Sequence, residues 1–279
     1  MNMPRPAPAA PPAGPRLPAH GADSGSFGQH MHEWWLLWWS NLYLGSSMLV
    51  LLCRPGRHWW RIWQVVTAQV YARLRWSLLG FLLIAYILGS VATQITQQTL
   101  HGFGLAHFTP SLMVRILLAE VVPLAAALVA AIKLTIPLGA ELAMLRHRKH
   151  LARLEAAGID ALQTEFLPRL LMGVYAAIMF AALGSATVMV TLYLNIYGYT
   201  LAGLEVFTHA FARTMTPLFT FIFAAKAVAF GYIVALIPLT AAFTDPRYGL
   251  RRDSELATLA RMLALLILVE VLSLVANYY

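Results

Sequence analysis

The sequence predicts an all-α integral membrane protein, and three observations lead to that prediction. First, 59% of its 279 residues are hydrophobic and only 11% are charged, with a mean hydropathy of +0.66. These values lie far from those of an ordinary soluble domain. Second, the apolar residues form runs of the roughly 20 residues that an α-helix needs to cross the hydrocarbon. Third, Lys and Arg gather in alternate connections between these runs.

The remaining composition excludes other classes. A net charge of +8 could suggest a nucleic-acid binder, but such a protein needs a basic face on a soluble fold. Here the cations flank apolar runs instead. The single cysteine, Cys53, excludes an intramolecular disulfide and a cysteine-only metal cage. We interpret it as a packing residue.

The N-terminal quarter contains two segments of different composition. Residues 1–30 are dominated by Pro, Ala and Gly, and they bury too little apolar surface to offset the entropy of ordering, so a disordered tail is expected. Its Pro-rich run precedes any apolar stretch, which does not fit a signal peptide. Residues 31–75 combine a cluster of tryptophans with arginines.

Tryptophan favours the headgroup region of a membrane, where its ring is buried and its N–H stays hydrated. Residues 31–75 are therefore predicted to form an interfacial helix or hairpin on the inner leaflet. An aromatic ligand site and a sixth crossing are the alternatives. A metal site at His30, His32 and His58 is not favoured, because no carboxylate or cysteine completes the ligand set.

Residues 76–279 are predicted to form a five-span domain. The expected spans cover residues 76–96, 112–138, 167–196, 217–243 and 256–276. The connections at 138–169 and 244–253 are rich in Lys and Arg, whereas those at 101–110 and 197–213 are poor in them, so the first pair is expected inside. The N-terminus is then cytoplasmic and the C-terminus outside, and a short external helix is expected within residues 201–212.

Among the ionisable residues inside these spans, five are candidates for a buried role: Arg115, Glu120, Lys133, Lys226 and Glu270. Each costs roughly 2.5 to 3.5 kcal/mol at the centre of the membrane, even on a lenient scale. Arg115 and Lys133 are expected to lie near an interface and to extend their charges into water. Glu120, Lys226 and Glu270 have apolar sequence on both sides, so we expect them to face the bundle interior. There they form either a buried structural network or a gate or substrate contact.

Motifs for catalysis are absent from the sequence. It contains no G-x-x-x-x-G-K-[ST] phosphate loop, no G-x-S-x-G elbow and no H-E-x-x-H pair. Enzymatic activity therefore has no support, and no metal or cofactor is expected to bind this chain. The remaining interpretation is a transport pathway that is driven by a separate energy-supplying protein.

Several fragments in order resemble the MlaE/YrbE permeases of MCE-associated ABC lipid transporters. The resemblance covers residues 76–279. In the second span and the connection after it, the matching residues are Glu120 and Pro123, then Ala140, Glu141 and Leu142 of an A-E-L-G-x-M motif, and then Leu154, Ala157, Gly158, Ile159 and Asp160. Further along the chain they are Pro168 and Arg169, Lys226 to Gly231, and Glu270. The departures are Ala119 in place of arginine, Ala143 in place of glycine, Leu145 in place of methionine, Ala161 in place of proline and Arg148 to Leu151 in place of T-E-Q-I. The chain therefore resembles a divergent member of this permease family.

The resemblance implies a permease that pairs with a second permease subunit in the inner membrane of a bacterium. A cytoplasmic ABC ATPase, which holds ATP and Mg²⁺, and a periplasmic MCE-domain protein are the implied partners, and phospholipid or a similar lipid is the implied cargo. The basic connection then contains a cytoplasmic coupling helix. Glu141, Leu145, Arg146 and Lys149 are expected to line the ATPase contact. Alternatively, they are solvated residues of a basic loop.

Two other functional classes remain open at this stage. One is the transmembrane coupling subunit of an energy-coupling-factor importer, which also has about five spans, although the Ala-Arg-Gly pairs expected there are missing. The other is a non-transporting scaffold, or the inactive half of a heterodimeric permease.

Overall fold

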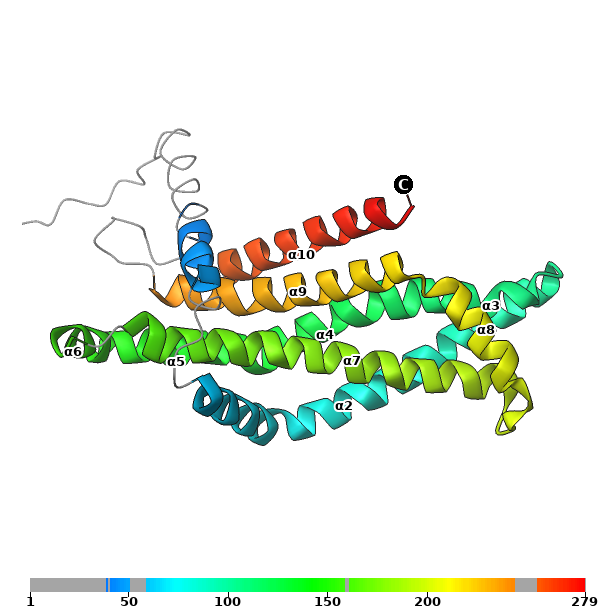
Figure 1. Ribbon diagram of the computed structural model, residues 1–279, viewed down its shortest axis with the longest axis horizontal. Helices are drawn as coiled ribbons and strands as arrows, with labels where there is room; N and C mark the ends of the chain where they lie inside the picture. Colours follow the sequence, from blue (N-terminus) through cyan, green and yellow to red (C-terminus); the bar gives the residue numbers. More distant parts are fainter. Residues whose placement is uncertain (1–38, 40, 51–58, 159–160, 244–254, 279) are drawn as a thin grey trace, which may run out of the picture. The chain divides into compact units, whose positions relative to one another are not determined.

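The chain is almost entirely helical in the residues that the computed structural model describes, which are 39, 41–50, 59–158, 161–243 and 255–278 (Figure 1). Within them, five helical stretches are long and apolar enough to cross a membrane: Ile62–Gly102, Ala106–His147, Leu162–Tyr197, Pro217–Ala241 and Leu256–Asn277. This confirms the predicted all-α membrane fold. The predicted tail, residues 1–30, lies outside the described residues, as do parts of the predicted interfacial segment, residues 31–75.

The first span belongs to one long helix, α2 (Trp59–Gly102). It begins well before residue 76, where the sequence placed the start of the span. Residues 59–76 contain no Gly or Pro, and Arg and Gln are good helix formers, so nothing in this stretch ends the helix. The basic residues Arg73 and Arg75 therefore lie on the same helix as the apolar span. A separate short helix over residues 41–50 packs on α9 (Pro217–Phe243) through a hydrogen bond from the Tyr232 hydroxyl to the Gly45 carbonyl, at 2.6 Å.

The second span is a series of helical segments rather than one regular helix. It comprises η1 (Ala106–Phe108), α3 (Thr109–Met113), η2 (Val114–Val121), α4 (Val122–Ala130), η3 (Ala131–Thr135) and α5 (Ile136–His147), of which η2 and η3 are π-helical. Another π-helical segment, η4 (Leu162–Phe166), precedes α7 (Leu167–Tyr197).

Each of these three π-helical segments ends two residues before a proline, namely Pro123, Pro137 and Pro168. Proline lacks an N–H, and its ring clashes with the carbonyl four residues before it. The wider hydrogen-bonding pattern of a π-turn lets the helix continue through that defect. The prolines thus explain where the irregular segments occur.

The other described elements are α6 (His150–Ala156), η5 (Leu201–Gly203), α8 (Leu204–Thr214) and α10 (Glu255–Tyr278). The short helix expected within residues 201–212 is confirmed by η5 and α8. Figure 1 shows α5 and α6 at one end of the spans and α3 and α8 at the opposite end. We refer to these as the α6 end and the α8 end.

Helices α7 and α9 form the centre of the packing. Helix α7 contacts α2, α4 and α9, and α9 also contacts α5 and α10. Two glycines allow close approach: a Cβ at Gly139 would lie 2.8 Å from the Pro238 carbonyl oxygen, and one at Gly173 would lie 2.6 Å from the Ala235 Cβ. Helices α2 and α10 keep long apolar faces exposed, which leaves surface for lipid or a second subunit.

Candidate functional site

The structure brings Glu120, Lys226 and Glu270 together from three separate helical elements. Lys226 on α9 forms ion pairs with the Glu120 carboxylate of η2 and, at 2.9 Å, with Oε2 of Glu270 on α10. The Lys226 side chain is only 2% exposed, and the two glutamates are 16% and 17% exposed. One ammonium thus faces two carboxylates within the apolar helices, as expected for residues that face the bundle interior.

A backbone carbonyl completes the surroundings of the ammonium. The Lys226 Nζ donates a hydrogen bond to the Ala119 carbonyl oxygen at 3.1 Å. Ala119 lies four residues before Pro123, which has no N–H to give to that carbonyl in a regular α-helix. The ammonium thus donates hydrogen bonds to Ala119 and Glu120, and it forms an ion pair with Oε2 of Glu270. The proline therefore helps to create the acceptor that the lysine uses.

Two other candidates, Lys133 and Arg115, do not join this triad. Lys133 on η3 and Arg115 on η2 are exposed. Arg115 instead lines a small pocket at the α8 end, together with Thr214, Thr216 and Asn277.

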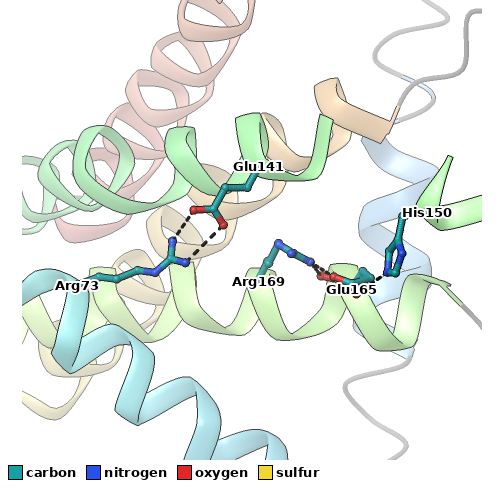
Figure 2. A network of polar contacts seen from close by, with 5 residues as sticks. All are labelled: Arg73, Glu141, His150, Glu165 and Arg169. Carbon is teal, nitrogen blue, oxygen red and sulfur yellow. Dashed lines mark hydrogen bonds and ion pairs between the residues drawn. The ribbon is translucent and has the colours of Figure 1, made fainter. Parts of the chain in front are cut away.

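The connection between the second and third spans is held by ion pairs at the α6 end (Figure 2). Glu141 on α5 accepts two hydrogen bonds from Arg73 of α2, with Nη1–Oε1 at 2.9 Å and Nη2–Oε2 at 3.4 Å. Both side chains are nearly half-exposed. The carboxylate of Glu141 is therefore directed toward the first span of its own chain, a contact that the sequence pattern did not reveal.

A second polar cluster joins α6 to the base of α7 (Figure 2). Glu165 pairs with Arg169 one helical turn later, and the His150 Nε2 lies 3.7 Å from the Glu165 Oε1. The spacing of Glu165 and Arg169 is a signal that sequence reasoning could have used. The partner on α6 could not be found that way, since it depends on how the chain reverses.

That reversal occurs at Arg148 and Lys149, between α5 and α6. Lys149 has φ of 56°, the left-handed conformation that often ends a helix. The Lys149 side chain is exposed, and those of Leu145 and Arg146 are partly buried. The predicted coupling helix is accordingly made of two parts, the last turns of α5 and the separate helix α6.

Two larger depressions lie on the surface. An apolar groove of about 590 Å³ runs between the helix over residues 41–50, α7 and α9, and its lining includes Met48, Val174 and Phe221. A second depression of about 410 Å³, near the end of α2, is lined by Gln94, Gln97, Gln98 and His101. In the described parts of the chain, no three His, Cys, Asp or Glu residues are placed to hold a metal ion.

Comparison with known proteins adds one match. A family model described as Permease MlaE matches residues 66–274, a range that contains the triad, the α5–α6 connection and parts of all five spans. No curated protein matches the chain.

Proposed function

Because the chain belongs to the MlaE permease family, we propose that it is the transmembrane permease subunit of an MCE-type ABC transporter. It moves phospholipid or a similar hydrophobic lipid between the inner membrane and the periplasm or outer membrane. A separate cytoplasmic ATPase drives the transport and binds the ATP and Mg²⁺. The family match across the five spans is the observation that carries this proposal.

The distribution of charge supports the orientation. Basic residues gather at the α6 end, where they include Arg73, Arg75, Arg148, Lys149 and Arg153. By the positive-inside rule, the α6 end faces the cytoplasm and the α8 end faces the periplasm. The N-terminus is then cytoplasmic and the C-terminus periplasmic. A second permease subunit and a periplasmic MCE-domain protein complete the proposed assembly.

The α5–α6 connection is the proposed contact with the ATPase. A permease without its own nucleotide site needs a cytoplasmic element that receives the movement of the ATPase. Leu145, Arg146 and Lys149 lie in this connection, and they are proposed to line the contact. Glu141, which belongs to the same proposed set, also pairs with Arg73, so it ties the contact to the first span.

Reversal of charge tests the coupling. The double variant Arg146→Glu/Lys149→Glu should lower the lipid-stimulated ATPase activity of the complex without unfolding the permease. Arg75→Glu, an exposed basic residue of α2 at the same end, is the matched control and should leave the activity unchanged. If the double variant assembles and hydrolyses ATP like the wild type, the assignment of this contact is wrong.

Mass spectrometry of the intact complex tests the proposed function as a whole. Recovery of the permease with an ATPase, an MCE-domain protein and bound phospholipid supports it. A small substrate-binding partner without an MCE protein would favour an energy-coupling-factor importer. Recovery with a second, different permease would indicate a heterodimer, and recovery without an ATPase would indicate a scaffold.

The triad of Glu120, Lys226 and Glu270 has two candidate roles within this function. As a gate, its ion pairs would break and re-form as the helices move during transport. As a structural network, they would only hold η2, α9 and α10 together. The contacts among the three helices support both roles, and a charge-free variant, described in the Discussion, separates them.

A further inference from the structure

A small polar pocket at the α8 end is lined in part by Arg115, an exposed residue. Its volume is about 80 Å³, room for about two to three water-sized groups. Arg115 comes from η2, Thr214 from the end of α8, Thr216 from the connection of α8 to α9, Phe219 from the first turn of α9 and Asn277 from the end of α10. Three separate parts of the sequence thus line one pocket.

Arg115 has no acidic partner in the described parts of the chain. No hydrogen bond or ion pair joins its guanidinium to another described residue, and no Asp or Glu lines the pocket. An arginine remains charged under all ordinary conditions. Within a membrane-spanning segment, an unpaired charge is costly, and a bound anion would lower that cost.

The other polar groups of the pocket are suited to the same anion. The Thr216 hydroxyl oxygen accepts the Phe219 N–H at 3.3 Å, which leaves its own O–H free to donate. The Asn277 side chain contributes an amide that can donate two hydrogen bonds. Helix α9 begins at Pro217 beside the pocket, and the partial positive charge of its N-terminus adds to the charge of the guanidinium. Arginine with neutral donors is typical of phosphate recognition.

The surroundings favour a lipid over a free anion. Ile116 follows Arg115 directly, and Leu218 lies on the pocket wall, and both are exposed apolar residues, at 48% and 67%. They belong to helical stretches apolar enough to cross a membrane. A ligand that satisfies both the guanidinium and these side chains carries a phosphate joined to hydrocarbon chains.

The pocket is separate from the buried triad, although both use the same helices. Ile222, which also lines the pocket, lies one helical turn before Lys226 on α9. Arg115 and Glu120 are both on η2, but only Glu120 pairs with Lys226. Both glutamates of the triad thus pair with Lys226 and neither pairs with Arg115, so the guanidinium is available to an external ligand.

We propose that this pocket binds the phosphate of a phospholipid headgroup at the α8 end of the membrane-spanning helices. The proposal rests on the proposed lipid transport and specifies the part of the substrate that this chain recognises. The Arg115 guanidinium binds the phosphate oxygens, and Thr216 and Asn277 donate further hydrogen bonds. The acyl chains lie along the exposed apolar residues of η2 and α9.

Native mass spectrometry of the purified full-length protein tests this site. Micelles are supplied with phosphatidylglycerol, with diacylglycerol of the same acyl chains, or with inorganic phosphate. Arg115→Gln should reduce retention of phosphatidylglycerol about tenfold, the effect of losing one charge-assisted hydrogen bond, and Arg115→Lys should lose less. Arg213→Gln is the matched control, because Arg213 is an exposed arginine on α8 outside the pocket, and it should retain lipid like the wild type. Diacylglycerol retention should be the same in all variants.

Equal retention of phosphatidylglycerol by wild type and Arg115→Gln would overturn the proposal. Binding of inorganic phosphate that depends on Arg115, without any such dependence for phosphatidylglycerol, would reassign the site to free phosphate and overturn the lipid source. Asn277→Leu provides a second variant if Arg115→Gln fails to fold, and it should also weaken lipid retention. If phosphatidylglycerol retention depends on Arg115 but the protein recruits no ATPase, only the proposed transport function is overturned. If the protein couples to an ATPase but phosphatidylglycerol retention does not depend on Arg115, only this site is overturned.

Discussion

Replacing Lys226 by methionine should destabilise the protein strongly. Lys226→Met removes the cation of the triad, keeps a side chain of similar length and leaves two carboxylates facing each other among apolar helices. Because the two glutamate side chains are only 16% and 17% exposed, water screens these charges weakly. Removal of one partner from a buried ion pair costs about 3 to 5 kcal/mol, and the loss of the bond to the Ala119 carbonyl is included in that range.

A charge-free triad should recover most of this loss. The triple variant Glu120→Gln/Lys226→Met/Glu270→Gln contains no uncompensated charge, and replacing a buried ionic network by neutral groups of similar volume is often close to neutral in stability. If the triad is only structural, the triple variant should also transport lipid. If it is a gate, the triple variant should be stable and inactive.

Equilibrium unfolding in mixed micelles, followed by tryptophan fluorescence, measures these free energies. Lys133→Met is the control, because Lys133 is an exposed lysine of the second span with no ion pair in the described residues. It should change the free energy of unfolding by less than about 1 kcal/mol, as is usual for surface substitutions. A Lys226→Met protein as stable as the wild type would refute the reasoning that the ammonium stabilises the two buried glutamates.

Four further variants test the packing of the helices and the ion pair at the α6 end. Glu141→Gln and Arg73→Gln should each lower the free energy of unfolding by less than about 1 kcal/mol, since both side chains are nearly half-exposed. If Glu141→Gln abolishes the stimulation of ATPase activity and Arg73→Gln does not, Glu141 contacts the ATPase directly. Gly139→Ala should lower the melting temperature, because its Cβ would lie 2.8 Å from a backbone oxygen of α9. Gly80→Ala is the control and should not lower it, since nothing lies within 4 Å of its Cβ. Equal melting temperatures for the two variants would contradict this packing argument. Tyr232→Phe removes a 2.6 Å hydrogen bond and should cost about 1 kcal/mol in unfolding experiments, and an unchanged stability would mean that this bond contributes little.

The spans were predictable because the hydrocarbon imposes a length and a composition that each helix must meet on its own. The meeting of Glu120, Lys226 and Glu270 could be inferred for a related reason, since each charge in an apolar helix needs a partner and few are available. The pairing of Glu141 with Arg73 was not predictable. Both are surface residues near the ends of the spans, where water is an adequate partner, so only the packed structure reveals it.

The prolines link the irregular geometry of the second span to its chemistry. A regular helix through Pro123 would leave the Ala119 carbonyl without a donor, a cost that apolar surroundings make severe. In this chain the ammonium of Lys226, on another helix, donates to that carbonyl while it forms ion pairs with the two glutamates. The proline, the π-helical segment η2 and the buried lysine therefore form one unit, in which the backbone defect supplies an acceptor for the buried cation. A change at any of these positions affects the other two, and the local sequence around Lys226 alone could not have shown this dependence.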